Sequence, residues 1–196
     1  MPLANSPWLT LQGFGNPEPQ TRTLVNDAHA GINATWVREV QKPTTSNLLQ
    51  TCVRDAVANN ITISISGGRH ALGTQQFATD SMLIDTTSLN RVIGLDPNNG
   101  IVKVEAGIRW PELMEGLREL QQEEPNPWVI RQKQGGSDEI CIGGTLSANA
   151  HGRGLGMKPI VDDVAFFEIV NASGELAVAN PSRVWESRTT NENSRQ

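Results

Sequence analysis

Two glycine-rich segments contain the residue types in this sequence that could hold a ligand. The first, residues 66–70 (Ser-Gly-Gly-Arg-His), comes directly after the alternating β-branched and polar run 61–65. A glycine pair at the end of a strand lets the backbone approach a ligand closely and gathers N–H donors in a concave turn, which suits a pyrophosphate. Such a pair is also common in plain tight turns, so these residues alone leave both interpretations open.

Two well-known nucleotide sites do not fit this first segment. It lacks the G-x-G-x-x-G form followed by a helix that binds dinucleotides in a βαβ unit. It also lacks the Lys-Ser/Thr ending of a nucleoside triphosphate loop. NAD and ATP are therefore poor candidates for these residues.

The second segment, residues 142–152 (Ile-Gly-Gly-Thr-Leu-Ser-Ala-Asn-Ala-His-Gly), carries a small side chain at nearly every position. It is either a long surface loop or a backbone wall that closes on a flat or extended cofactor. Because two such segments occur in one short chain, the cofactor interpretation stands beside the plain one.

The overall composition argues against several classes of partner. A chain of 196 residues with 37% hydrophobic content can form an ordinary core, and its net charge of −5 with 16 scattered Lys and Arg residues offers no basic surface for nucleic acid. No apolar run approaches the roughly 20 residues of a membrane-spanning helix, and the N-terminus lacks a signal-peptide pattern. We expect no membrane association and a cytoplasmic protein. Cys52 and Cys141 lack metal-ligand spacing, so no metal site is predicted.

The remaining pattern predicts an α+β fold that is rich in strands. Hydroxyl residues at 44–46 can cap a helix whose apolar positions recur at three- and four-residue spacing and which ends near residues 59–60. The same spacing predicts a second helix over 110–121. The predicted strands and turns are strands at 61–65, 82–85, 92–95, 101–105 and 164–170, a hairpin turn at 96–100 and a turn at 171–174.

The two ends of the chain show no sustained period. Residues 1–35 are rich in Asn, Pro, Gly and Thr, and we predict an irregular arm or a short terminal strand there. Residues 181–196 hold almost no apolar side chains and cannot form a core element. This segment is predicted to be a polar tail at a point of truncation.

Several motifs resemble, in order and spacing, those of the FAD-linked oxidases of the vanillyl-alcohol oxidase / para-cresol methylhydroxylase superfamily. They are residues 66–70, 142–147 and 150–152, and the segment from Asp163 to Gly174. The loop pattern is nearest to alditol and sugar-lactone oxidases, and the similarity spans about residues 36–180. It implies two small α/β subdomains of the FAD-binding (PCMH-type) fold, with the C-terminal part of that fold missing.

The resemblance also implies where FAD is held. In this family the first glycine segment holds the FAD pyrophosphate, the second runs along the flavin, and the following strand contacts the adenine. The implied cofactor-binding residues are Ser66, Gly67, Gly68, Arg69, His70, Ala71, Gln75, Gly136, Cys141, Gly144, Ser147, His151 and Val170.

The histidines and two departures from the family pattern refine this expectation. His70 lies where many family members attach the flavin C8 methyl group through a histidine nitrogen, so the resemblance implies covalent FAD; a noncovalent loop histidine is the alternative. Ala71 stands where a Ser often follows and Cys141 where Ser or Thr is usual, which removes hydroxyl donors. His151 could be a catalytic base, but its Ala-His-Gly context favours a structural role beside the cofactor. His29 has no motif around it and is expected to face solvent.

The implied reaction is oxidation of an alcohol of the sugar, alditol or lactone type by hydride transfer to flavin N5. The base for the hydroxyl proton normally comes from a substrate-covering domain that longer family members add, so no catalytic residue is assigned in this chain. The expected partners are a small-molecule substrate in the full-length form and, as an option, a separately encoded substrate domain. The alternatives are an FAD-binding module and a truncated remnant without independent catalysis.

Overall fold

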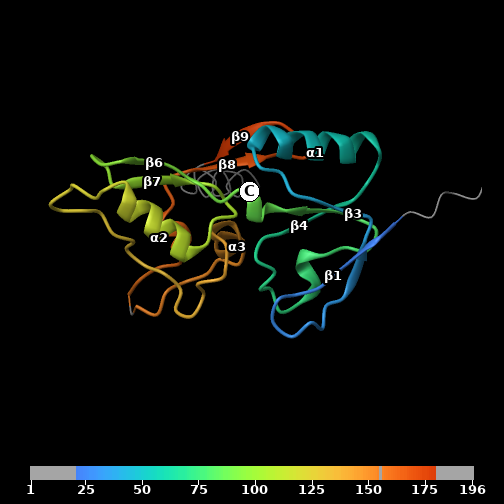
Figure 1. Ribbon diagram of the computed structural model, residues 1–196, viewed down its shortest axis with the longest axis horizontal. Helices are drawn as coiled ribbons and strands as arrows, with labels where there is room; N and C mark the ends of the chain where they lie inside the picture. The colour runs from blue at the N-terminus through green and yellow to red at the C-terminus, as the bar shows by residue number, and fades with distance from the viewer. Residues whose placement is uncertain (1–20, 155, 180–196) are drawn as a thin grey trace, which may run out of the picture.

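The computed structural model describes residues 21–154 and 156–179, whose elements form two subdomains and a final hairpin (Figure 1). The first subdomain contains β1 (Thr23–Val25), β2 (Thr35–Val37), β3 (Glu39–Gln41), α1 (Ser46–Ala58), β4 (Ile63–Ser66) and β5 (Met82–Asp85). The second contains β6 (Val92–Asp96), β7 (Ile101–Val104), α2 (Trp110–Glu119) and α3 (Ile142–Ser147). The hairpin consists of β8 (Phe167–Val170) and β9 (Leu176–Ala179). No helix among the described residues is long and apolar enough to cross a membrane.

Strand β5 is the centre of a three-stranded parallel sheet with the order β3-β5-β4. All four of its residues are buried, as expected of a strand that has a neighbour on each side and packing on both faces. Its Leu83 pairs with Val40 on β3 and with Ser64 on β4. The core of the first subdomain consists of Leu83 and three buried side chains from neighbouring elements: Val25, Val37 and Phe77.

Helix α1 connects β3 to β4 and begins where the sequence predicts. The Thr45 hydroxyl accepts a hydrogen bond from the Leu48 N–H at 3.2 Å, so Thr45 is the N-cap. Val53 and Ala56, three positions apart, are the buried residues of the helix and form its inner face. The helix ends at a cap on Asn59, which confirms the predicted end near residues 59–60.

The second subdomain has a core of its own. β6 and β7 form the predicted antiparallel hairpin, and α2 packs on it with Gly116 beside Val92. Four buried side chains form the centre of this core: Ile108, Trp110, Leu113 and Ile160. The two separate clusters agree with the two small subdomains that the sequence implies.

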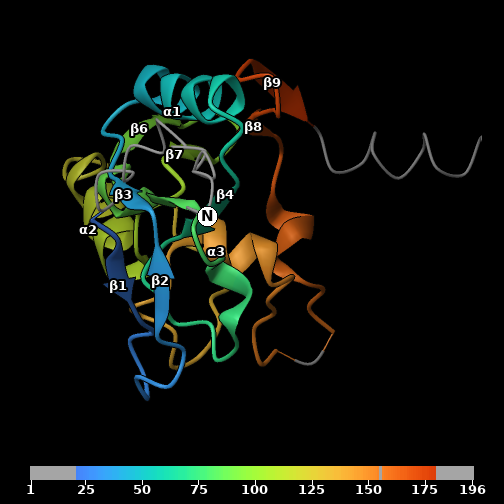
Figure 2. The same ribbon diagram turned by 90° about the vertical axis from the view of Figure 1, so that its right-hand side faces the viewer.

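The β8–β9 hairpin follows the second subdomain in the chain but lies beside helix α1 of the first (Figure 2). At its turn, the Gly174 carbonyl accepts hydrogen bonds from the side chains of Arg54 at 2.9 Å and Gln50 at 3.1 Å. Lys103 of β7 and Glu168 of β8 form an ion pair at 2.7 Å. The hairpin therefore contacts both subdomains.

The structure corrects the prediction for residues 142–152. This segment is not a continuous loop or extended wall, because its first six residues form helix α3. Ile142, Leu146 and Ala150 recur every four residues and pack against the second core, which is the burial that stabilises the helix despite its glycines.

Other element boundaries also differ from the sequence predictions. Strand β8 begins at Phe167 rather than at the predicted residue 164, because Ile160–Asp163 form the 3-10 turn η3, which the Val164 N–H closes on the Val161 carbonyl. Helix α2 ends at Glu119, two residues earlier than predicted. The arm predicted over residues 1–35 contributes the short strand β1, while residues 1–20 and the predicted tail 181–196 lie outside the described residues.

Replacing Leu83 tests whether β5 holds the first core together. Leu83 is 0% exposed, so Leu83→Ala is expected to lower the free energy of unfolding by about 2–5 kcal/mol. Urea denaturation followed by circular dichroism measures this change. The matched control is Ile65→Ala on the adjacent strand, where a 60% exposed side chain should cost less than about 0.5 kcal/mol. Equal effects of the two variants would show that β5 is not the centre of the core.

Candidate cofactor site

The first glycine segment lies at the carboxyl edge of the parallel sheet, where ligands bind in open α/β sheets. Asp85 ends β5 there with a side chain that is 5% exposed, and its carboxylate pairs with Arg69 at 3.1 Å and with Lys42 at 3.9 Å. The Thr86 hydroxyl donates to the Ser66 carbonyl at 3.2 Å. These contacts fix the start of the segment against the end of the neighbouring strand.

The backbone of this segment presents donors without partners. The N–H groups of Gly67, Arg69, His70 and Ala71 donate no hydrogen bond to another described residue. Arg69 lies in the left-handed region with φ of 60°, which turns the chain sharply at this point. Successive free N–H groups beside an arginine form an electropositive turn that suits an anion.

The two glycine segments meet at Gly67 and Gly68. A Cβ on Gly67 would lie 3.1 Å from Cβ and Sγ of Cys141, and one on Gly68 would lie 2.6 Å from the Glu139 carbonyl oxygen. Space, rather than a positive φ, is therefore what requires glycine at these positions. Burial raises the pKa of the Cys141 thiol, which also faces the backbone of Gly68, so Cys141 is a neutral packing residue at the junction.

The beginning of the second segment is hydrogen-bonded to the loop between β7 and α2. The Ile142 N–H donates to the Ile108 carbonyl at 2.9 Å, and the Gly143 N–H donates to the Ala106 carbonyl at 2.8 Å. A Cβ on Gly143 would lie 3.0 Å from Ala106, so glycine again permits the close approach. Helix α3 therefore has a fixed position next to the first segment.

The other predicted residues occupy more exposed positions. Gly144 and Ser147 are exposed on α3, and the Ser147 hydroxyl donates back to the Gly143 carbonyl at 2.8 Å. Gly136 is exposed with φ of 74°, a value that favours glycine. His151 is also exposed, with Nδ1 2.9 Å from the Gly152 carbonyl oxygen.

Two predicted residues lie on separate elements. Gln75 is exposed in the 3-10 turn η1 (Thr74–Gln76) and lies next to Gly73, whereas its neighbour Gln76 is buried and donates to the Ala71 carbonyl at 3.2 Å. Val170 is half-buried at the end of β8. Within the described ranges, the Gln75 side chain makes no hydrogen bond to either glycine segment.

His29 is a residue of the site that the sequence reasoning missed. It is exposed, as expected, but its Nε2 lies 3.3 Å from Nδ1 of His70, and the two rings meet edge to face with centroids 4.9 Å apart. The only local signal was the Asn-Asp pair at 26–27, whose side chains commonly build turns.

A loop over residues 26–33, here called the Asp27 loop, brings His29 to this position. The buried Asp27 carboxylate accepts hydrogen bonds from five backbone N–H groups, those of residues 29–33. These bonds, led by the one from Ala30, hold the pKa of Asp27 well below its usual range. The loop is tied to the first glycine segment because the Ala28 N–H donates to the Arg69 carbonyl at 2.8 Å.

The surroundings of His70 favour its neutral form. Burial lowers the pKa of His70, the nearby His29 lowers it further, and the Glu139 carboxylate acts in the opposite direction. Because the net shift is downward from 6.5, the imidazole is mainly neutral at pH 7. A neutral imidazole has a nitrogen lone pair available for bonding or for accepting a proton.

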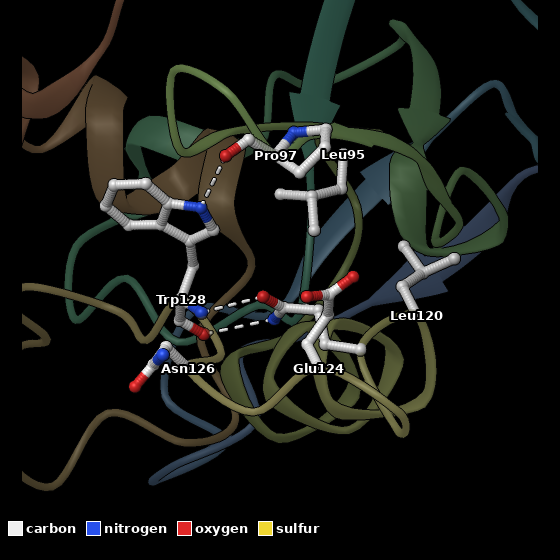
Figure 3. Close-up of a pocket in the computed structure, with 7 residues that line it drawn as sticks. Leu95, Pro97, Leu120, Glu124, Asn126 and Trp128 are labelled. Carbon is white, nitrogen blue, oxygen red and sulfur yellow. Dashed lines mark hydrogen bonds between the residues drawn. The ribbon is translucent and has the colours of Figure 1, made fainter.

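A surface hollow of about 270 Å³ lies elsewhere, beside α2 and the β6–β7 turn (Figure 3). Its contacts have a structural explanation. The Trp128 N–H donates to the Gln121 amide oxygen at 2.7 Å, and the Gln121 amide N–H donates back to the Trp128 carbonyl at 3.1 Å. The Trp128 indole N–H donates to the Pro97 carbonyl at 2.8 Å. None of the predicted cofactor residues lines it. Among residues 21–154 and 156–179, no group of three or more His, Cys, Asp or Glu side chains is placed to hold a metal ion.

Comparison with known families shows which family has this arrangement. A family model described as "FAD binding domain" matches residues 38–180, which is most of the chain. This chain belongs to that family of FAD-binding domains. The superfamily implied by the two glycine segments and the α+β fold of PCMH type are thereby confirmed.

Its curated relatives are longer proteins. L-gulono-1,4-lactone dehydrogenase of Mycobacterium tuberculosis is 26% identical over 137 residues, which are 70% of this chain and 30% of the relative. L-galactono-1,4-lactone dehydrogenase 1, mitochondrial, of Oryza sativa subsp. japonica is 32% identical over 98 residues, which are 50% of this chain and 16% of the relative. The chain thus spans less than a third of the length of either relative.

Solved structures show the same fold. Xylooligosaccharide oxidase from Myceliophthora thermophila C1 superposes with a TM-score of 0.56 and 21% identity, covering 76% of this chain and 31% of that one. An alkyldihydroxyacetonephosphate synthase superposes with a TM-score of 0.58 and 18% identity, covering 72% and 26%. At these identities the likeness shows the fold alone.

The described residues fit FAD at the first glycine segment. Its free N–H groups and Arg69 are donors of the kind that a pyrophosphate needs. The hydroxyls of Ser66 and Thr145, one from each segment, are buried and have no hydrogen-bond partner among the described residues. Buried polar groups normally have partners, so these two hydroxyls have bonding capacity left for a ligand bound beside the two segments.

Replacing Asp27 tests the loop that carries His29. Because the pKa of Asp27 is lowered in the folded chain, its carboxylate stabilises the fold above its unfolded pKa, near 4, and this stability is lost as the pH falls. Asp27→Asn should therefore unfold more easily at pH 7. It should also lose less stability than the wild type as the pH falls from about 5 to about 3, a range set by the unfolded carboxyl pKa. Urea midpoints across this range measure both effects, and parallel pH profiles for the two proteins would contradict the assignment.

Replacing Gly68 tests the junction of the two segments. In Gly68→Ala the new Cβ meets a backbone carbonyl at 2.6 Å, so the segments must separate. We expect the Kd for FAD to rise about tenfold or more, equivalent to about 1.4 kcal/mol. Quenching of flavin fluorescence measures the affinity. The matched control is Gly94→Ala, where no atom lies within 4 Å of the new Cβ, and unchanged affinity in both variants would refute the role of the junction.

Proposed function

We propose that this chain is the FAD-binding part of an oxidoreductase that acts on a CH–OH group of a sugar, alditol or lactone, and that it holds FAD through a covalent bond to His70. The observation that carries the proposal is the position of His70. It follows a turn of unpaired N–H groups at the carboxyl edge of the sheet, and its own imidazole is mainly neutral at pH 7.

The chain's residues would bind and orient the cofactor. The N–H groups of Gly67, Arg69 and Ala71 would donate to the pyrophosphate, and the Arg69–Asp85 pair would keep this turn in place. The small residues of α3, Gly144 and Ser147 among them, would allow the backbone to approach the flavin. When bound, FAD supplies a ring nitrogen that accepts hydride from a substrate carbon.

The covalent bond is supported by the state of His70. In forming it, His70 would give up the proton of one ring nitrogen and gain the carbon of the C8 methyl group, which loses a hydrogen. The two protons and two electrons released would be taken up by dioxygen, the electrons by way of the flavin, to give hydrogen peroxide. Only a neutral imidazole offers the lone pair for this bond, and burial together with His29 favours that form.

The substrate class is supported by the names of the relatives. Two of them are dehydrogenases of L-gulono-1,4-lactone and L-galactono-1,4-lactone, and the matched regions cover 30% and 16% of their lengths. We therefore propose that the substrate site and the base for the hydroxyl proton belong to a substrate domain outside the described residues, in the same or a separate chain. The same FAD site would also serve a module that holds FAD without turnover.

Acid precipitation of the protein after incubation with FAD tests the covalent bond. The wild-type pellet should be yellow, and His70→Ala should give a colourless pellet while noncovalent FAD binding changes by less than about tenfold. The matched control is Leu72→Ala, two residues away with a 72% exposed side chain, which should stay yellow. A yellow pellet from the His70 variant would remove His70 from the proposed role, and a colourless wild-type pellet would refute the covalent bond itself.

A further inference from the structure

The hollow of about 270 Å³ beside α2 has a fixed aromatic wall (Figure 3). The six-membered ring of Trp128 lies against Gly100, because a Cβ on that glycine would come within 2.8 and 2.9 Å of three ring carbon atoms. The indole N–H is bonded to the Pro97 carbonyl, and the buried Gln121 bonds the Trp128 backbone. Small-molecule pockets commonly measure roughly 300–1,000 Å³, so this hollow suits one small group of a ligand.

The hollow combines apolar walls with a single carboxylate. Leu95 and Pro97 form one wall and Leu120 forms another, opposite Trp128. Figure 3 shows the Glu124 carboxylate pointing between Trp128 and Leu120, toward Leu95. An anionic group therefore lies among aliphatic and aromatic surfaces.

The charge of this part of the chain is unbalanced. Residues 90–128 contain seven acidic and four basic side chains. The four bases have carboxylate partners other than Glu124, namely Arg91 with Glu105, Lys103 with Glu168, Arg109 with Glu139 and Arg118 with Glu115. No other ion pair within residues 21–154 and 156–179 includes Glu124. Its carboxylate thus has no cationic partner among the described residues.

A second hollow, of about 480 Å³, adjoins the first at Leu120, which lines both. It lies where α2 packs on β6, and Val92, Gly116 and Glu119 are among its lining residues. Glu119, like Glu124, takes part in no ion pair within the described ranges. Two carboxylates without cations therefore flank an apolar side chain.

We propose that these two hollows bind an aliphatic amine, with an ammonium group held by Glu124 and the Trp128 ring and with its methylene chain on Leu120. The face of an indole ring attracts a cation, and the carboxylate neutralises its charge. The aliphatic walls favour methylene groups over water. None of the predicted cofactor residues lines either hollow, so this site is separate from the proposed FAD site.

Titration of the full chain with diaminopentane tests the site. The chain has five tryptophans, and proton–nitrogen NMR gives one indole N–H signal for each. We expect the Trp128 signal, identified by its loss in Trp128→Leu, to shift with a Kd of about 1 mM, while the other signals move little. Pentanol has a similar chain without charge and should bind at least about tenfold more weakly.

Variants separate the carboxylate from the ring, with isothermal titration calorimetry as a readout that does not need the indole. Glu124→Gln and Trp128→Leu should each weaken diaminopentane binding about tenfold. Trp128→Phe keeps an aromatic face and should retain most of the affinity. The matched control is Glu123→Gln, a neighbouring exposed carboxylate that lines neither hollow, and its Kd should stay within about twofold of the wild type.

A free amine and a lysine side chain of another protein present the same ammonium group, and a short peptide with two lysines distinguishes these sources. Tighter binding of the peptide supports a protein partner, tighter binding of diaminopentane supports a free amine, and equal binding shows recognition of the ammonium group alone.

Three results would overturn the inference: equal affinity for pentanol, wild-type affinity in Glu124→Gln, or a shift centred on another tryptophan. Competition between diaminopentane and FAD would also overturn it, because the amine would then occupy the cofactor site.

Discussion

The close approach of two backbones at Gly67 and Gly68 is the constraint on which the rest of the site depends. A Cβ at Gly68 would come within 2.6 Å of the Glu139 carbonyl oxygen, and one at Gly67 would press on Cys141. Each subdomain has its own apolar core, so neither core determines how the two halves meet. The absence of a side chain on Gly67 and on Gly68 is what allows the end of the parallel sheet and the start of helix α3 to lie together.

A buried charge stabilises the same edge of the sheet. The Asp85 carboxylate is almost inaccessible to solvent, and burial of an unpaired carboxylate would be costly. Arg69 and Lys42 approach it, and it also accepts hydrogen bonds from the backbone and side chain of Thr87. Arg69 thus links the sheet to the glycine turn, while its own carbonyl accepts the bond from the Asp27 loop. Arg69 therefore contacts the end of β5, belongs to the first glycine segment and binds the loop that carries His29.

Sequence patterns predicted the elements that carry a clear period and failed where structure comes from long-range contacts. The Thr45 cap, strand β5 and the β6–β7 hairpin were predictable because capping chemistry and alternation are local. Strand β3 has only three residues, too few for a period, and forms through pairing with β5. Helix α3 was hidden by its glycines, and the contact of His29 with a residue 41 positions away depends on loop bonds that no periodicity encodes.

The β8–β9 hairpin has a consequence for how the two halves are attached. The chain passes from the first subdomain to the second after β5 and comes back when the hairpin docks on helix α1 through Gly174. The two halves are therefore joined by two crossings of the polypeptide instead of one. The contacts of the hairpin with α1 thus attach the second half to the first at a point separate from the connection after β5. The two halves that carry the glycine segments are therefore held together both at Gly67 and Gly68 and at the turn of the hairpin.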